Sequence, residues 1–402
     1  MKCLDARSTA TFSARLIWAL PDTEGETDLI HLPNPSRDAD IFGRAPAFDC
    51  SAGLVADIGG TNARFGWVSA DGATVTHVRT LSSAHFAGPA EAAQAYLAEL
   101  AQTLGLDYQA PRAGAFAVAT AVGADRVAFT NSDWAFSRAA AQAALGLEEL
   151  LLVNDFEALA LSLPRLQHQQ VQAIRRADAA RHSSDLSNSP NAATGQGTPN
   201  SCSGSLAVIG PGTGLGVAGL VRTRHGWVAV PGEGGHATLS ATDAFDAEVL
   251  AAARQQFAHV SAERLLSGIG LPVLHAAVGV VLGQPGQPLS SESIVERGLA
   301  RSDAVCSQTV DSFCALLGSF AGNVALMLGA RGGVYIGGGI VPRLGARFMA
   351  SKFRERFEAK GRFAPYLRAV PTYLITDTLA ALSGAALALE QREPPRPAQA
   401  TA

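Results

Sequence analysis

Short apolar segments alternate along the chain with longer segments whose apolar residues recur at helical spacing. Residues 54–58 and 63–68 are apolar on both sides of a glycine turn, and residues 73–81 are rich in β-branched side chains, so three strands are predicted. Residues 90–104 have the spacing of a helix. The next segments predict strand, helix, strand and helix in turn: "AGAFAVAT", "SRAAAQAAL", "ELLLVND" and "FEALALSL". This order predicts an α/β layer with mixed strand directions.

The same order of elements begins again after residue 204. The segment "SLAVIGPGTGLGVAGLVRT" predicts a strand, a glycine turn and a strand, as "GLVADIGGTNARFGWVS" does near the start. Helical spacing covers residues 303–328, "GGVYIGGGI" predicts a short buried strand, and "TDTLAALSGAALALE" predicts a final helix. Two halves that begin alike indicate a duplicated fold. We expect a cleft between the two copies, because small ligands commonly bind in such clefts.

Three regions lack these patterns. Residues 1–52 mix Asp, Pro, Asn and Arg with few periodic apolar positions, so we expect a flexible N-terminal extension. Residues 165–204 include "HSSDLSNSPNAATGQGTPNSCSG", whose small and polar side chains bury too little apolar surface to offset the entropy of ordering. We predict a flexible insertion there and a flexible tail at 391–402.

Composition narrows the class of protein. The chain has 402 residues, 48% of them hydrophobic and 16% charged, and a net charge of −4, which is typical of a soluble globular protein and gives no basic surface for nucleic acid. The five cysteines show no Cys-x-x-Cys spacing, so we expect reduced thiols in a cytoplasmic protein, without disulfides or a zinc knuckle. No apolar run approaches the roughly 20 residues that span a bilayer, so we expect no membrane partner and no export.

The first glycine turn carries side chains that suit a phosphate group. Gly59 and Gly60 permit close backbone approach, and Thr61 and Asn62 can donate hydrogen bonds to phosphate oxygens. The carboxylate of Asp57 could hold a water bound to Mg²⁺. The same residue types are ordinary in hairpin turns, so a purely structural turn is the alternative.

The second glycine turn matches a different pattern. Residues 214–219, "GLGVAG", fit G-x-G-x-x-G, and Glu233 follows where a ribose-binding acid would be expected. A dinucleotide-binding fingerprint must follow a strand and open a helix. The residues after 219 are β-rich instead, so we discount a dehydrogenase.

Seven motifs in a fixed order carry a resemblance: "ADIGGTNARF", "TNSDWAFS", "NDFEALALSLP", "GPGTGLGVA", "PGEGGHATL", "ERLLSGIGL" and "GGVYIGGGIVPRL". Together they resemble the bacterial glucokinase family of ATP-dependent hexose kinases, over residues 53–390 without the insertion. The resemblance implies an α/β fold of the actin-like ATPase (ribonuclease H-like) type with two domains and an interdomain cleft. It implies a small domain at 53–164, joined by a C-terminal helix at 378–390, a large domain at 205–377, and a homodimer.

The resemblance implies that Asp155 is the catalytic base. A sugar hydroxyl is a poor nucleophile, and a carboxylate that accepts its proton as the γ-phosphoryl group arrives is the usual remedy. Asn-Asp before a helix also suits an N-cap, a role that is compatible with catalysis.

The resemblance also implies which residues bind the sugar: Asn154, Asp155, Glu233, His236 and Glu263. Without the motif, Glu263 would be taken as a solvated acid in a first helical turn. In a related repressor and kinase family, a histidine at the position of His236 binds zinc with a cysteine cluster, but no cysteine lies between residues 202 and 306 here. Asn131 is a candidate on the substrate side, with an ordinary turn residue as the alternative.

On the nucleotide side, the resemblance implies phosphate contacts from Gly59, Gly60, Thr61, Asn62, Gly212, Thr213 and Gly214. Gly338 and Gly339 would lie close to the adenosine, and Asp57 would contact Mg²⁺ through water. Arg64 could be a phosphate ligand or an ion-pair partner. The predicted reaction is phosphoryl transfer from MgATP to the 6-hydroxyl of D-glucose, giving glucose 6-phosphate and ADP as in glycolysis. The alternatives are a sugar-sensing regulator without useful turnover and a kinase of another hexose.

Overall fold

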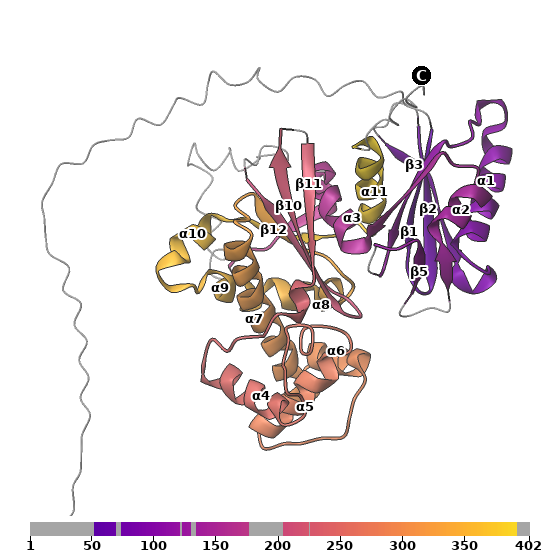
Figure 1. Ribbon diagram of the computed structural model, residues 1–402. Helices are drawn as coiled ribbons and strands as arrows, with labels where there is room; N and C mark the ends of the chain where they lie inside the picture. The colour runs from indigo at the N-terminus through magenta and orange to yellow at the C-terminus, as the bar shows by residue number, and fades with distance from the viewer. Residues whose placement is uncertain are drawn as a thin grey trace, which may run out of the picture. The chain divides into compact units, whose positions relative to one another are not determined.

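The computed structural model describes residues 52–69, 74–120, 123–129, 134–176, 204–224 and 226–391 (Figure 1). Almost all of the predicted N-terminal extension and C-terminal tail lies outside these residues. Asn131 and most of the predicted insertion also lie outside them.

The first sheet has the strand order β3-β2-β1-β4-β7. β2 runs antiparallel to β1 and β3, whereas β1, β4 and β7 are parallel. The strands are β1 (Gly53–Ile58), β2 (Asn62–Val68), β3 (Val75–Ser82), β4 (Ala113–Val118) and β7 (Glu149–Asn154). A further pair that the sequence did not predict, β5 (Arg126–Ala128) and β6 (Ala135–Ser137), forms a small separate sheet.

Side chains of β1 alternate between two buried layers, which explains its unbroken apolar run. Leu54 and Ile58 pack in a cluster that includes Tyr96 of α1. Val55 points to the other face and packs in a cluster that includes Ala385 of α11. Figure 1 shows α1 and α2 on one side of this sheet and α11 on the other. These helices are α1 (Pro89–Leu104), α2 (Arg138–Ala144), α3 (Asp155–Ser162) and α11 (Ala380–Glu390).

The second sheet repeats the path of the first. Its order is β11-β10-β9-β12-β13-β8, with β10 antiparallel to β9 and β11, and β9, β12 and β13 parallel. The first five strands therefore follow the same order as the first sheet, and the predicted duplication is confirmed. The strands are β9 (Leu206–Pro211), β10 (Leu215–Thr223), β11 (Gly226–Gly232), β12 (Gly333–Ile336) and β13 (Thr372–Ile375).

The sixth strand of this sheet corrects the predicted insertion. β8 (Val171–Ala173) pairs antiparallel with β13. The Thr372 hydroxyl, on β13, donates to the carbonyl of Ile174, 2.9 Å away. Regular structure thus continues into the range 165–204, and the predicted start of the flexible segment was wrong because even a three-residue strand can add to an existing sheet edge.

The helices of the second half follow the strands in blocks. Between β11 and β12 lie α4 (Ala244–Arg254), α5 (Leu271–Val281), α6 (Ser291–Ala300) and α7 (Ala304–Met327). After β12 come α8 (Ile340–Met349), α9 (Phe353–Glu358) and α10 (Ala364–Ala369). Single 3₁₀ turns are η1 (Ser83–His85), η2 (Gly105–Asp107), η3 (Leu163–Arg165), η4 (His168–Gln170), η7 (Gly234–His236) and η8 (Gly361–Phe363).

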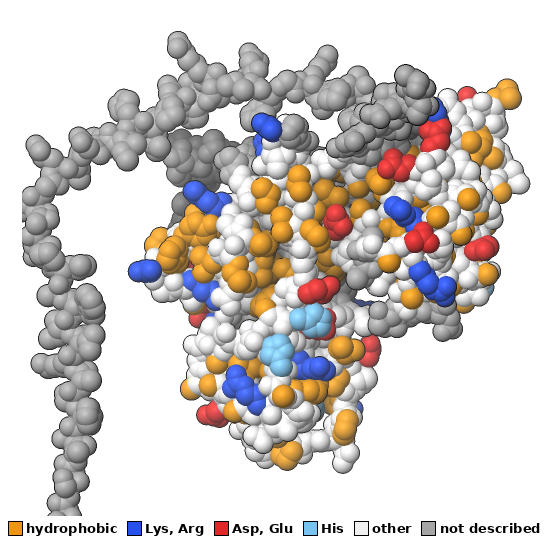
Figure 2. Space-filling view, in the orientation of Figure 1, with side chains coloured by type: hydrophobic (Ala, Val, Ile, Leu, Met, Phe, Trp, Pro, Cys, Tyr) orange, Lys and Arg blue, Asp and Glu red, His pale blue; other side chains and the backbone are white. Residues whose placement is uncertain are grey.

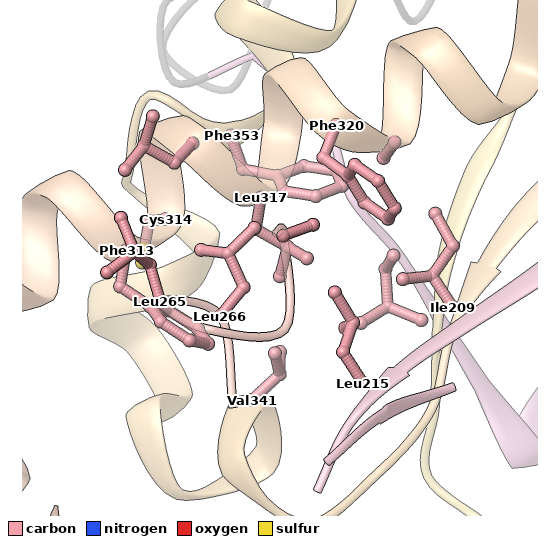
Figure 3. Close-up of a cluster of buried hydrophobic side chains, with 14 of the residues drawn as sticks. Ile209, Leu215, Leu265, Leu266, Phe313, Cys314, Leu317, Phe320, Val341 and Phe353 are labelled. Carbon is pink, nitrogen blue, oxygen red and sulfur yellow. The ribbon is translucent and has the colours of Figure 1, made fainter. Parts of the chain in front are cut away.

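α7 is the central helix of the larger apolar core. Phe313 and Leu317 on α7 pack with Leu266, from the loop between α4 and α5, and with Phe353 from α9 (Figure 3). A Cβ placed on Gly318 would lie only 2.1 Å from the carbonyl oxygen of Phe353, so glycine there permits the close approach of α9 to the α7 backbone. This packing supports the loop that leads to the candidate site.

The same helix corrects the expectation that no apolar segment is long enough to span a bilayer. α7 has 24 residues and is long and apolar enough to cross a membrane by length and composition alone. Most of its apolar window is buried inside the protein, which is the property of a core helix.

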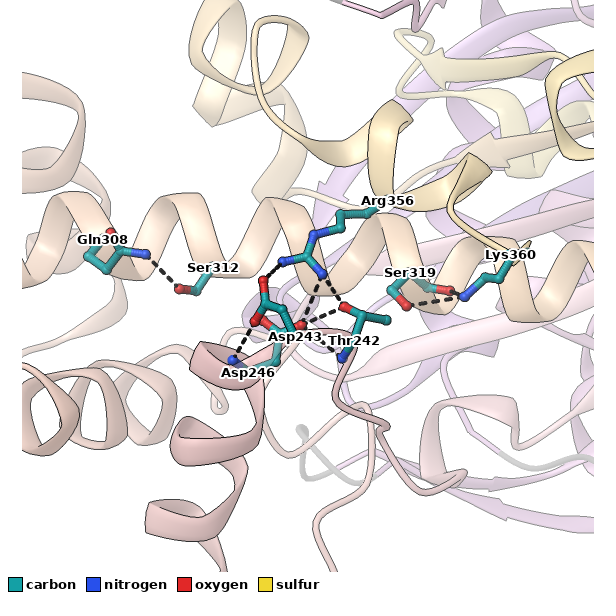
Figure 4. Close-up of polar contacts among 8 residues, drawn as sticks. All are labelled: Thr242, Asp243, Asp246, Gln308, Ser312, Ser319, Arg356 and Lys360. Atoms are coloured by element: carbon teal, nitrogen blue, oxygen red, sulfur yellow. Dashed lines mark hydrogen bonds and ion pairs between the residues drawn. The ribbon is translucent and has the colours of Figure 1, made fainter. Parts of the chain in front are cut away.

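Polar contacts join α9 to the start of α4, and the segment after α9 to α7 (Figure 4). Arg356 of α9 forms ion pairs with Asp243 and Asp246, the second at 3.3 Å. Lys360 donates to the carbonyl of Ser319 on α7 at 2.9 Å. The charged groups of this region are thereby paired across elements distant in sequence, which fixes the helical layer around the larger core.

Candidate active site

The first glycine turn connects β1 to β2 and places two side chains of opposite charge across from each other. Asp57 and Arg64 are direct partners across the two strands. An Arg64 Nη atom donates to the Asp57 carboxylate at 2.8 Å. Arg64 thus forms an ion pair with Asp57, which is one of the two roles that the sequence left open.

The tip of this turn presents backbone donors. The amide of Gly59 donates to the carbonyl of Asn62 at 3.0 Å and closes the turn. Within the described residues, the amides of Gly60 and Thr61 donate to no protein acceptor, and the Thr61 and Asn62 side chains are exposed. Free amides at a glycine turn can bind an anion, as a phosphate-binding turn requires.

Asp155 begins α3 directly after the buried strand β7. Asn154 is the N-cap of this helix: its Oδ1 accepts from the Phe156 amide at 2.9 Å, and its own amide donates to Glu157 at 3.4 Å, which completes a capping box. The Asn154 Nδ2 also donates to the carbonyl of Thr120 at 3.2 Å. The capping role therefore belongs to Asn154, and Asp155 is not needed as the cap.

The surroundings of Asp155 favour its neutral form. Burial raises the pKa of Asp155 to about 6; the Phe156 amide lowers it, and the nearby Asp57 carboxylate raises it. Burial likewise raises the pKa of Asp57, against the lowering effect of Arg64. The two carboxyl groups thus interact, although they come from β1 and from the start of α3. A carboxylate whose pKa is close to working pH suits a general base.

The residue after Asp155 anchors it against the second glycine turn. A Cβ on Gly216 would lie 2.1 Å from ring atoms of Phe156, and a Cβ on Gly210 would lie 2.4 Å from them. Gly210 and Gly216 are direct partners across β9 and β10. The glycines leave room for the ring, so the start of α3 rests on the base of the second hairpin. The sequence analysis missed this contact, because it took these glycines only as turn residues.

The second turn is held by its carbonyl groups. The Gly212 amide donates to the Gly214 carbonyl at 2.9 Å. The amides of Gly268 and Ile269 donate to the carbonyls of Gly212 and Thr213, at 2.7 and 3.3 Å. Among the described residues, no protein acceptor pairs with the Thr213 and Gly214 amides. This turn therefore also presents free donors, supported by a loop that the sequence analysis did not assign to it.

Glu263 is fixed beside the second turn. Its Oε2 accepts from the Leu215 amide at 2.9 Å, and its own amide donates to the Gly235 carbonyl at 2.8 Å. A Cβ on Gly214 would lie 2.5 Å from that carboxylate oxygen. Glu263 is thus anchored to the turn, which is a different setting from a solvated acid in a first helical turn.

His236 connects the acidic residues of this region. Its Nε2 lies 3.8 Å from a Glu263 oxygen and 4.0 Å from a Glu233 oxygen. The Glu233 and His236 side chains are 83% and 60% exposed, so both can reach a ligand from solvent. In Figure 2, histidine and acidic side chains lie next to one another in the middle of the face shown. Three residues implied as sugar ligands are thus brought together.

The glycines after β12 lie against the same turn. Gly338 has φ +76°, and a Cβ there would lie 2.5 Å from the Pro211 carbonyl oxygen. Gly339 is the N-cap of α8, and a Cβ on it would meet nothing within 4 Å.

Residues 214–219 continue into β10 rather than a helix, so discounting the dinucleotide fingerprint was correct.

The implied site residues therefore fall into two groups. Asp57, Asn154 and Asp155 lie with the first turn, and Glu233, His236 and Glu263 lie with the second. Phe156 links the groups through its glycine contacts. No hydrogen bond or ion pair joins Asp155 to the second group within the residues that the structure describes.

Comparison of the fold identifies the class first. The ROK hexokinase from Thermus thermophilus superposes with a TM-score of 0.56 at 17% identity, covering 85% of this chain and 99% of that one. At this identity the likeness concerns the fold, which is a mixed α/β fold found in sugar kinases.

The sequence comparisons then identify the family. The chain belongs to the glucokinase family, whose family model matches residues 54–392. It is similar to the glucokinase of Aromatoleum aromaticum, with 46% identity over 338 residues, 84% of this chain and 94% of that protein. The Chromobacterium violaceum glucokinase is 43% identical, covering 85% and 90%. A solved glucokinase from an Antarctic psychrotroph has 35% identity and a TM-score of 0.72, covering 86% of this chain and 100% of that one.

Proposed function

We propose that this protein is a glucokinase that transfers the γ-phosphoryl group of MgATP to the 6-hydroxyl of D-glucose. One observation supports the proposal beyond family membership: Asp155, half-buried at the start of α3, has a pKa of about 6, and the next residue, Phe156, packs against Gly210 and Gly216 of the second hairpin. A base at this position would act beside two turns that present free amide donors.

Asp155 would accept the proton of the sugar hydroxyl as the new oxygen–phosphorus bond forms and the bond to ADP breaks. Its own environment supports that role, because desolvation makes its carboxylate a stronger base than an exposed one. The Asn154 cap fixes the backbone at this point, so the carboxylate is held by the helix start rather than by a mobile loop.

The two turns would bind the phosphates of ATP. The first would use amides of Gly60 and Thr61, and the second those of Thr213 and Gly214. Negative phosphate groups suit these amides, whereas the open surface at Gly339 and the start of α8 would leave room for the nucleoside.

The residues fit Mg²⁺ on one observation. The Asp57 carboxylate raises the pKa of Asp155, so a cation between the phosphates and Asp57 would relieve this repulsion. Oxygen ligands with retained waters are the preference of Mg²⁺. When bound, the ion would neutralise charge on the phosphates, and Asp57 would hold it through water while Arg64 orients Asp57.

The sugar would be bound by Glu233, His236 and Glu263, with Asn154 and Asn131 as further contacts. Acidic, imidazole and amide groups together match hydroxyl groups that both donate and accept hydrogen bonds. We further propose the actin-like ATPase arrangement, in which two domains close on the substrates across a cleft, and a homodimer. Small-angle scattering with and without glucose, and sedimentation, would measure both.

The reaction is tested by a coupled assay with glucose and ATP, run beside a calorimetric measurement of glucose binding. A glucokinase produces glucose 6-phosphate at a rate that saturates with both substrates. A folded protein that binds glucose but forms no product would defeat the proposal and support a sugar-sensing regulator. Faster turnover of another hexose in the same assay would replace glucose as the substrate.

A further inference from the structure

A separate group of ligand-type side chains lies where α5 meets α7. His275 is on α5, Asp303 is the N-cap of α7, and Cys306 follows in the first turn of α7. One nitrogen, oxygen or sulfur atom from each of the three lies within 4.8 Å of the other two. None of these residues belongs to the proposed glucose or ATP sites.

His275 differs from the other two residues of this cluster in its hydrogen bonding. The His275 side chain is only 6% exposed, yet neither ring nitrogen forms a hydrogen bond within the residues that the structure describes. A ring nitrogen that has no protein partner is available to a ligand, as the nitrogen of a neutral imidazole is in metal sites. Asp303 accepts from the Cys306 amide through Oδ1 at 2.9 Å, and it also interacts with the Cys306 thiol and the Val305 amide, so the two prospective ligands Asp303 and Cys306 already contact each other.

Each residue is also held in place by its element. Asp303 and Cys306 are three residues apart around the N-cap of α7, so both side chains lie at the same end of the helix. Cys306 is fully buried. His275 occupies the middle of α5 and is directed into the protein, where α5 packs against α7. The cluster is therefore assembled by helix packing and not by a mobile loop.

We propose that His275, Asp303 and Cys306 bind one zinc ion. Imidazole, carboxylate and thiolate are all zinc ligands, and a thiolate disfavours Mg²⁺ and Ca²⁺, which prefer oxygen. Zinc bonds of about 2.0–2.3 Å require the ligand atoms of a tetrahedral site to lie about 3–4 Å apart, a separation that small side-chain rotations reach from the present one. Water would complete the four ligands.

The charge of the site is compatible with such an ion. Zinc binding would release the thiol proton of Cys306, and ionised Asp303 and Cys306 would then supply two negative charges to balance the two positive charges of the ion. The bound ion would connect α5 to the start of α7. It would thus act as a structural link beneath the larger core, independent of phosphoryl transfer.

The test uses the full chain, stripped of metal by a chelator and titrated with Co²⁺ alone as a spectroscopic substitute for zinc. One equivalent of Co²⁺ should produce the near-ultraviolet charge-transfer absorption of a cobalt–thiolate bond, and excess Mg²⁺ should leave it unchanged. Saturation with Zn²⁺ at about one hundred times its Kd should raise the Tm by about 4 °C. A folded native chain without this absorption, or its loss when Mg²⁺ is added, would overturn the proposal.

Because the chain has five cysteines, variants are needed to show which thiol binds the metal. Cys306→Ser should abolish the charge-transfer band, whereas Cys314→Ser, at a buried thiol on the same helix, should retain it. Asp303→Asn can still cap α7 and should weaken Co²⁺ binding at least tenfold, as should His275→Gln. A band that survives Cys306→Ser, or affinity unchanged in folded Asp303→Asn, would refute the assignment.

Discussion

Replacing Asp155 by Asn should stabilise the protein at neutral pH. The pKa of Asp155 is raised from 3.8 to about 6, chiefly by burial. A carboxyl group whose pKa is higher in the folded state contributes stability that is fully present below its unfolded pKa and is lost as pH rises through its folded pKa. The ionised group therefore destabilises the folded protein above pH 6. Asn removes this charge and can still accept the hydrogen bond from the Phe156 amide.

The size of the effect follows from the two pKa values. The shift of about two units corresponds to about 3 kcal/mol at pH 7.5, about 1.6 kcal/mol at pH 5 and about 0.6 kcal/mol at pH 4. The stability advantage of Asp155→Asn over the native chain should therefore shrink steadily as pH falls. This pattern is expected of a functional group held in a setting that costs stability.

Urea denaturation of both proteins at pH 7.5, 5 and 4 measures these differences. Asp107→Asn, at an exposed acid in η2, is the matched control and should change stability by less than about 0.5 kcal/mol. If Asp155→Asn is no more stable than the native chain at pH 7.5, or if its advantage does not fall toward pH 4, burial does not govern the pKa of Asp155.

Three further predictions concern the reaction and the second glycine turn with the strand that follows it. The kcat/KM for glucose should fall about tenfold per pH unit below pH 6, because the base must be ionised and the pKa of Asp155 is about 6. A profile that stays flat down to pH 5 would exclude Asp155 as the titrating base. Gly216→Ala places a Cβ 2.1 Å from the Phe156 ring, so the free energy of unfolding should drop by about 1–3 kcal/mol and kcat should fall. In the control Gly286→Ala the new Cβ meets nothing within 4 Å, so neither quantity should change. Gly214→Ala should displace the Glu263 carboxylate from the Leu215 amide. The KM for glucose should then rise about tenfold, because one hydrogen bond to a charged group is lost. An unchanged KM would show that Glu263 does not belong to the sugar site.

The local elements could be predicted from the sequence because they depend on local signals. The alternation around Gly59 and Gly212 marked two hairpins, and their repeat marked a duplicated fold. β8 was missed, since a three-residue strand is too short for a pattern and forms only where the edge of another strand is available. The sequence analysis found no apolar run long enough to span a bilayer and so did not recognise α7 as apolar along its length. Many of its residues are small, and its glycines pack against α9 without being strongly hydrophobic themselves.

The candidate site was predictable only through its motifs. Asp155 and Glu263 are 108 positions apart, and no spacing rule brings their surroundings together. The Phe156 contact with Gly216 depends on the packing of one half against the other, so local propensity contains no signal for it. The cluster of His275, Asp303 and Cys306 was hidden for the same reason: it lacks the close ligand spacing by which zinc sites are found in sequences.

The most direct test of the central claim is the kinetics of Asp155→Asn with glucose and MgATP. If Asp155 is the base, kcat should fall by about 10²–10⁴-fold. The Kd for glucose, measured by calorimetry on the same sample, should change little, because the proton transfer matters in the transition state. A folded variant that binds glucose normally and loses less than tenfold in kcat would contradict the assignment of Asp155 as the base.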